Sequence, residues 1–116
     1  MNEFTDTSKT REIQRQVKEE KRITERNISD MKWLLNQVQF RRFAWRILSD
    51  VRMFNSTFST NALQAAFNEG RRDIGLGLLK DINEANPNAY PQIQQEYVSE
   101  QKSKKDADQK EEDDNG

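Results

Sequence analysis

Apolar residues recur with the period of an α-helix in the middle of the chain and become sparse toward both ends. One apolar series becomes dense at Ile28, and its phase slips at Gln39, where a second series takes over. The slip predicts a kink or short turn near residues 36–39, followed by a second helix over about residues 40–52. The two series are Met31, Leu34, Leu35 and Val38, then Phe40, Phe43, Ala44, Ile47, Leu48 and Val51.

A third apolar series predicts a helix that begins near Thr60, with Ser59 or Thr60 as its cap, and ends near residues 83–86. Residues 53–59 before it are rich in Ser, Thr and Asn, which favour local backbone bonds over helix. We expect Phe54 and Phe58 to pin this connection onto the core. The series, with steps of three and four, is Ala62, Leu63, Ala66, Phe67, Gly70, Ile74, Leu78 and Ile82.

Both ends of the chain are polar. Residues 1–28 contain no Gly or Pro and many helix formers, which predicts a charged helical arm. Pro91 suits the first turn of a fourth helix with a short apolar face. Residues 100–116 hold almost no apolar side chain, which predicts a disordered acidic tail. The expected fold is all-α: three to four short helices forming a small bundle over residues 29–99, flanked by the arm and the tail.

The composition excludes several kinds of chemistry. None of the 116 residues is Cys or His, so the chain has no disulfide, thiol nucleophile, Cys/His zinc site or histidine general base. Glu69 and Asp73 share a helix face, but a carboxylate metal site needs three or more converging carboxylates. Ser, Lys and Tyr stand in no recognised catalytic spacing. The sequence therefore predicts a protein without catalytic activity, cofactor or metal.

No segment predicts a signal peptide or a membrane span. The first residues lack the basic and apolar regions of a secretory signal. The longest apolar runs, such as residues 33–35, are three residues long, whereas a spanning helix needs about 20.

The net charge of −1 conceals a segregated pattern. Residues 31–80 carry eight basic and three acidic side chains, a net charge of +5, whereas residues 81–116 carry four basic and ten acidic ones, a net charge of −6. The middle of the chain can attract phosphates or an acidic partner, and the tail would repel them. The alternative is a solvated surface with a solubilising tail. The candidate basic surface consists of Arg41, Arg42, Arg46, Arg52, Arg71 and Arg72.

Aromatic residues are interleaved with these arginines, a pattern that can bind single-stranded nucleic acid through charge and stacking. Phe40, Phe43 and Phe67 fall on core phases, however, and a small helical domain needs such rings as its core. Trp33 and Trp45 fall nearer the edges and are candidate partner contacts. Arg71 and Arg72 have acidic neighbours, Glu69 and Asp73, with which they can form intramolecular pairs instead.

Three glycines, Gly70, Gly75 and Gly77, lie inside the third helical pattern. Each costs about 1 kcal/mol relative to Ala in a helix interior, so the helix should gain something in return. Gly70 and Gly77 lie near one face, where a second backbone can approach closely, either the second helix or a neighbouring subunit. They are therefore candidate partner contacts. A phosphate-binding loop is disfavoured because no Lys-Ser/Thr pair and no preceding strand are present.

Residues 41–97 resemble a known family. An Arg-Arg pair leads into a helix (Arg41-Arg42-Phe43-Ala44-Trp45-Arg46-Ile47-Leu48), followed by a Phe-x-Ser-x-Phe connection at residues 54–58, an aromatic-x-Glu-Gly-Arg-Arg-x-x-Gly helix at residues 67–75, and a Pro and Tyr at residues 87–91. These motifs are similar to those of a small helical protein family of tailed, mainly short-tailed, bacteriophages (podoviruses), named after a Bordetella phage member. That family has a Pro/Gly turn before the Arg pair; here residues 36–39 are Asn-Gln-Val-Gln, which also allows one long helix from about residue 10 to 52.

The resemblance implies a virion-associated or assembly role and carries over no catalytic residue. We therefore expect a non-enzymatic virion protein that docks on larger head, portal, tail or internal ejection proteins during assembly or DNA delivery. It would reside in the virion, and in the host cytoplasm during assembly. Homo-oligomerisation is a further expectation. The alternatives are a small phage regulator that binds nucleic acid through the basic surface of residues 31–80, and an accessory protein that binds a host enzyme.

Overall fold

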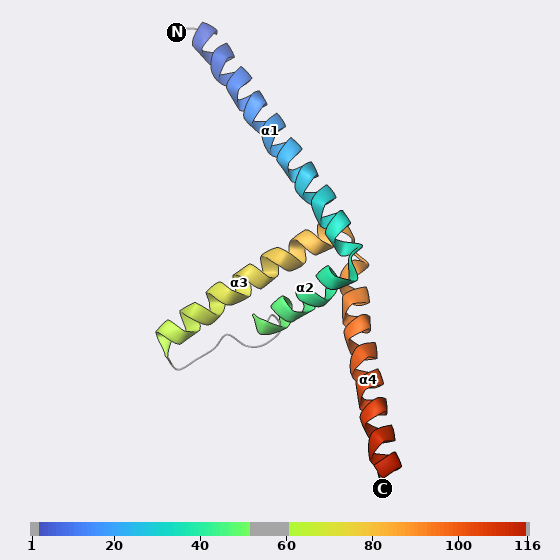
Figure 1. Cartoon of the computed structure of the whole chain (residues 1–116). Helices are drawn as coiled ribbons and strands as arrows, with labels where there is room; N and C mark the ends of the chain where they lie inside the picture. The colour runs from blue at the N-terminus through green and yellow to red at the C-terminus, as the bar shows by residue number, and fades with distance from the viewer. Residues whose placement is uncertain (1–2, 52–60, 116) are drawn as a thin grey trace.

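The structure is a computed structural model that describes residues 3–51 and 61–115, with side chains described from residue 7 onward. These residues form four helices: α1 (Glu3–Leu35), α2 (Val38–Asp50), α3 (Ala62–Ala85) and α4 (Ala89–Asn115) (Figure 1). The described residues form no strand, and the all-α prediction is confirmed. The predicted Phe54 and Phe58 contacts and Arg52 lie outside the described residues. The prediction of Ser59 or Thr60 as the cap of the third helix is wrong, because Asn61 is the cap.

The chain breaks between α1 and α2, where the phase of the apolar pattern slips. The amides of Asn36 and Gln37 donate to the carbonyls of Trp33 and Leu34, at 3.2 and 2.9 Å, which closes tight turns at the end of α1. Gln37 then takes an extended conformation, with φ −95° and ψ 120°, and α2 begins at the next residue. The predicted turn is confirmed, and the alternative of one helix from about residue 10 to 52 is wrong.

Helix α3 is flanked by an asparagine at each end. The side chain of Asn61 accepts hydrogen bonds from the amides of Leu63 and Gln64, at 2.9 and 3.2 Å, and so caps α3. At the other end, Asn86 is extended, with φ −158° and ψ 105°, as expected for a residue that precedes proline. Its side chain accepts from the amide of Asn88 at 3.0 Å, which shapes the short turn into α4.

The core lies where the four helices meet. Seven apolar residues are buried there, and every helix contributes at least one of them. Three of the seven are alanines, so the helices approach closely but bury little apolar area. The buried residues are Leu35, Ala44, Leu48, Ile82, Ala85, Ala89 and Ile93.

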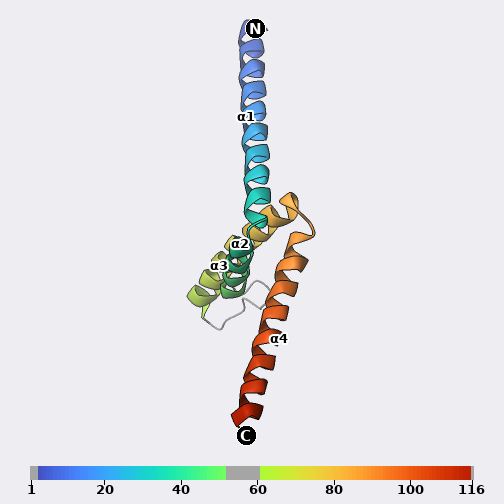
Figure 2. The same cartoon turned by 45° about the vertical axis from the view of Figure 1, so that its right-hand side comes forward.

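The molecule is extended, and the predicted compact bundle is not observed. Its radius of gyration is 22.5 Å and its dimensions are 90 × 41 × 16 Å, whereas a compact chain of this length has a radius of gyration of about 13 Å. Helices α1 and α4 run in opposite directions from the core, and α2 and α3 project to one side (Figures 1 and 2). Helices α1 and α4, with 33 and 27 residues, are longer than the short helices expected, whereas α3 spans its predicted range.

The prediction of a disordered tail is wrong, because α4 continues to Asn115. After Pro91 the helix contains no Gly or Pro, and most of its residues are helix formers such as Lys, Glu, Gln and Ala. An i,i+4 hydrogen bond from Gln109 Nε2 to Asp113 Oδ1, 3.1 Å long, adds local support. Every residue from 97 to 115 is exposed, as is every residue from 7 to 27 of the arm. Both extensions are therefore helices that contact no other part of the described chain over most of their length.

None of the described helices has an apolar stretch that could cross a membrane.

Candidate docking groove between α2 and α4

Helix α2 presents two different faces. Ala44 and Leu48 are buried in the core, whereas Arg42 and Arg46 are exposed. Phe43 lies on the exposed side with 46% of its surface accessible, so its predicted place in the core is wrong. The other ring predicted for the core alongside it, Phe40, is half-buried against the core as expected.

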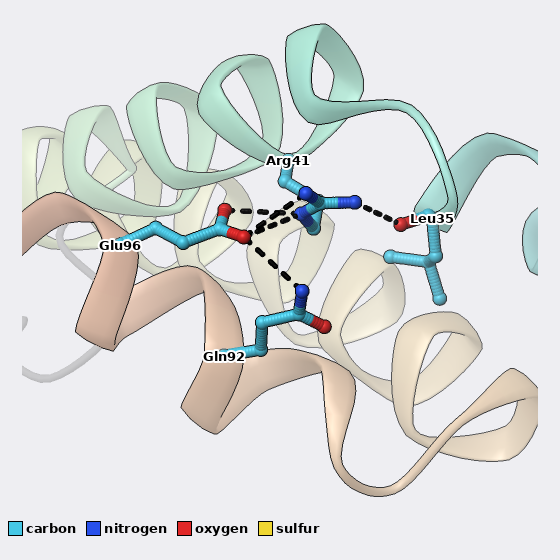
Figure 3. A network of polar contacts seen from close by, with 4 residues as sticks. All are labelled: Leu35, Arg41, Gln92 and Glu96. Atoms are coloured by element: carbon cyan, nitrogen blue, oxygen red, sulfur yellow. Dashed lines mark hydrogen bonds and ion pairs between the residues drawn. The ribbon is translucent and has the colours of Figure 1, made fainter.

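A polar network joins α2 to α4 and to the end of α1 (Figure 3). The Nε atom of Arg41 donates to both carboxylate oxygens of Glu96 at 3.0 Å, and Nη2 lies 3.0 Å from Oε1. Nη1 donates to the carbonyl oxygen of Leu35 at 2.8 Å, so a positive charge sits at the negative C-terminal end of α1. Gln92 donates to the same carboxylate at 3.1 Å. Arg41 thus fixes three helices relative to one another.

Aromatic side chains pack beside this network. The Trp45 ring stacks on Tyr97, with centroids 4.9 Å apart, and lies 6.3 Å from Tyr90. The guanidinium of Arg46 lies 5.4 Å from the centre of the Phe43 ring, within the range of a cation–π interaction. The Arg46–Phe43 contact lies on the exposed side of α2, whereas Trp45 packs against the core and α4.

Between α2 and α4 runs an open groove of about 1150 Å³. Arg42, Phe43, Trp45 and Arg46 line it from α2, and its α4 wall includes Tyr97. Acidic side chains line it as well, namely Asp50, Glu96 and Glu100. Glu96 is paired with Arg41. Arg42 and Arg46 are exposed in the groove and can contact a partner. The sequence pattern indicated the arginines and Trp45 as candidate binding residues, but it did not indicate the three acidic side chains, which we call the acidic wall. A signal for Glu96 was present, since it is the only charged residue between positions 89 and 99.

The five candidate arginines that the structure describes do not form one continuous surface. Arg41 is engaged with Glu96, and Arg71 donates to the backbone and side-chain oxygens of Asp50 at 2.8 and 3.2 Å. The ion pair of Arg71 therefore joins α3 to the end of α2; the pairing predicted with its helix neighbours Glu69 and Asp73 is not what the structure shows. The Nε atom of Arg72 is buried and meets no hydrogen-bond acceptor in the described part of the chain.

The remaining candidate contacts lie apart from the groove. Trp33 is 64% exposed near the end of α1. Gly70 and Gly77 are exposed, and a Cβ atom added at either would meet no described atom within 4 Å. A close approach of α2 at these two glycines, one of the two alternatives, is therefore wrong. The buried glycine of α3 is Gly75.

Burial raises the pKa of Tyr90 above its ordinary value of 10.0. The folded state therefore holds the phenolic proton to higher pH than the unfolded state. The contribution of this proton to the free energy of unfolding is complete below pH 10 and is lost as the pH rises through the pKa of Tyr90 in the folded state. We expect Tyr90→Phe to remove this part of the alkaline loss of stability. Urea unfolding of both proteins at neutral pH and above pH 10 measures it; the stability difference should be the same at both pH values if Tyr90 titrates normally.

Comparison with known proteins placed the central part of the chain in a family. No curated protein and no solved structure matched. A protein-family model described as Bbp19-like phage protein matches residues 31–95, more than half of the 116 residues. The matched segment contains all seven buried core residues. It omits the whole arm and α4 from Glu96 onward, and so leaves out the groove residues Glu96, Tyr97 and Glu100. The chain therefore belongs to the Bbp19-like phage protein family, as the motifs of residues 41–97 indicated.

Proposed function

We propose that this chain is a non-enzymatic structural protein of the phage particle, which docks through the α2–α4 groove on a larger head, portal, tail or internal ejection protein. The observation that carries the proposal is the groove itself, where Phe43, Arg42 and Arg46 are exposed beside the Trp45–Tyr97 stack. Tyr, Trp, Phe and Arg are the residues that protein interfaces use most as anchors.

The shape of the molecule supports the same role. The helical arm and the end of α4 expose almost every residue, and a helix without packing is marginal in water. A partner that covers these helices would supply the packing that the small core lacks. The described residues contain no cluster of three or more acidic side chains that could hold a metal ion.

The test is incorporation into phage particles. A phage that lacks the gene is complemented with the normal chain or with the double variant Arg42→Ala/Arg46→Ala, and purified particles are analysed by quantitative mass spectrometry. We expect the normal chain in the particle and the variant reduced about tenfold or more, the effect of removing interface anchors. A matched control, Lys104→Ala/Lys105→Ala, removes two charges from α4 beyond the groove and should be incorporated normally. Absence of the normal chain from particles and from assembly intermediates would refute the proposal.

A second candidate function is nucleic-acid binding, favoured by the Arg46–Phe43 pair, because guanidinium and aromatic groups together bind single strands. The acidic wall of the groove, with Glu100 and Asp50, counts against it because these groups repel phosphates. If this function is correct, the purified chain binds single-stranded DNA with an affinity that falls steeply between about 50 and 200 mM salt. The same Arg42→Ala/Arg46→Ala variant then loses that binding.

An accessory role on a host enzyme predicts recovery of that enzyme with the tagged chain from host lysate.

A further inference from the structure

Helix α3 has an apolar face that nothing in the described chain covers. Its inner face carries Gly75, Ile82 and Ala85, which are buried. On the outer face, Leu63 is 83% exposed, Phe67 60% and Ile74 69%. The predicted core positions in the N-terminal half of α3 are therefore wrong, because α3 extends past the other helices there (Figure 1).

The exposed residues form a regular stripe. Leu63, Phe67, Gly70, Ile74 and Gly77 follow one another at steps of four, three, four and three, which is the seam of a coiled coil. From Phe67 onward large side chains and glycines alternate along it, and the space above both glycines is open. A partner helix can therefore place a large side chain at Gly70.

We infer that this stripe is the interface with a second copy of the same chain, whose α3 lies antiparallel to the first. The pairing is centred between residues 67 and 70. Phe67 of each copy then lies over Gly70 of the other, and Leu63 lies opposite Ile74, so that four apolar layers form from one stripe. A two-fold axis makes such a surface complementary to itself.

Size and charge select this arrangement. A parallel pair places Phe67 against Phe67 and Gly70 against Gly70, which crowds one layer and leaves a void in the next. An antiparallel pair centred farther along, between residues 70 and 74, brings Arg71 against Arg71 and Asp73 against Asp73, and like charges at such positions repel. In the inferred register Arg71 faces Gln64 and Asp73 faces Ala66 of the other copy, so no like charges meet. Arg71 is already held beside Phe67 by Asp50, 5.6 Å from the ring centre.

The test is the oligomeric state of the full chain, measured by sedimentation velocity from about 1 to 200 μM, the range of weak interfaces. We expect a monomer–dimer equilibrium. Phe67→Glu should weaken it at least about tenfold, as loss of a central contact does. Trp33→Glu, a matched change at an exposed aromatic residue outside the stripe, should leave it unchanged. The inference is overturned if the normal chain stays monomeric throughout this range. The partner of the stripe is then a different protein.

A second variant separates loss of the interface from loss of folding. Gly70→Leu fills open space and replaces a poor helix former by a good one, so the urea midpoint of the monomer should rise. The same leucine occupies the space that Phe67 of the other copy needs, so dimerisation should weaken. A Gly70→Leu chain that dimerises as well as the normal one would contradict the proposed layers.

The register is tested by cross-linking, since the chain has no cysteine of its own. Single variants Leu63→Cys and Ile74→Cys are treated with a short thiol cross-linker, separately and mixed. The antiparallel register predicts dimers mainly in the mixture. Efficient cross-linking of each variant with itself indicates parallel helices and overturns the register.

Discussion

Ile82→Ala is expected to remove most of the stability of the folded core. Ile82 has no exposed surface and is, with Ile93, one of the two largest fully buried side chains. Removing the buried carbons of an isoleucine costs about 2–5 kcal/mol, whereas a core of this size seldom supplies more than about 3–5 kcal/mol in total. Urea unfolding followed by tryptophan fluorescence measures the loss, because Trp45 packs against the core.

The matched control for this variant is Ile13→Ala. The side chain of Ile13 lies on the arm and is 59% exposed, so the same chemical change should alter the free energy of unfolding by no more than about 0.5 kcal/mol. Equal effects of the two substitutions would mean that the four helices do not share one core, and that the meeting point of α1, α2, α3 and α4 is not what holds the molecule together.

Arg41→Met is expected to loosen α4 from α2 and to cost about 1–3 kcal/mol, the range for hydrogen bonds to charged groups. The change leaves Glu96 and the Leu35 carbonyl without their shared partner. The Arg41 side chain is 13% exposed but that of Glu96 is 33% exposed, so water can solvate the remaining carboxylate and the cost stays below that of breaking a fully buried pair. Urea unfolding gives the free energy, and small-angle X-ray scattering reports the change in the angle between the helices.

A double-mutant cycle with Glu96→Gln isolates the Arg41–Glu96 interaction. Glu96→Gln should cost less than Arg41→Met, since a glutamine can still accept from Arg41 and since the Leu35 contact persists. Arg42→Met serves as the control: Arg42 is the exposed neighbour of Arg41 on the same helix, and its change should be nearly neutral. Additive effects in the cycle would mean that the ion pair contributes nothing beyond its separate parts.

Local signals in the sequence predicted the helices well. The phase slip at Gln39 predicted the break before α2, and Pro87 and Pro91 predicted the turn into α4. Local signals were less informative about the ends. The acidic composition of residues 100–116 predicted disorder, yet the same residues are helix formers, and α4 continues through them. A high density of charged residues shows that a segment cannot form a hydrophobic core. A single exposed helix does not need a core, so the charge of residues 100–116 does not prevent them from being helical.

The candidate site was predicted only in part, because its elements come from distant parts of the chain. Arg42, Arg46 and Trp45 lie on α2 and were recognised from the pattern of basic and aromatic residues. Glu96 and Tyr97 lie more than 50 positions away from Arg41 along the chain, and no spacing rule connects them. Gly70 and Gly77 were recognised as candidate contacts because glycine lowers the stability of a helix. The sequence did not show whether other residues surround them, and in the structure the space at both is open.

The sequence by itself determined that this protein is helical, where its central helices begin and end, and to which phage family it belongs, since these depend on periods and motifs within short stretches. Only the tertiary structure decided which apolar faces are covered. Periodicity shows that α3 has an apolar stripe from Leu63 to Ile74, but burial depends on what lies opposite. In this chain the other helices cover only the C-terminal half of α3, where Ile82 is buried. The same reason explains why Arg41 fastens α4 whereas Arg42, the next residue, faces the open groove.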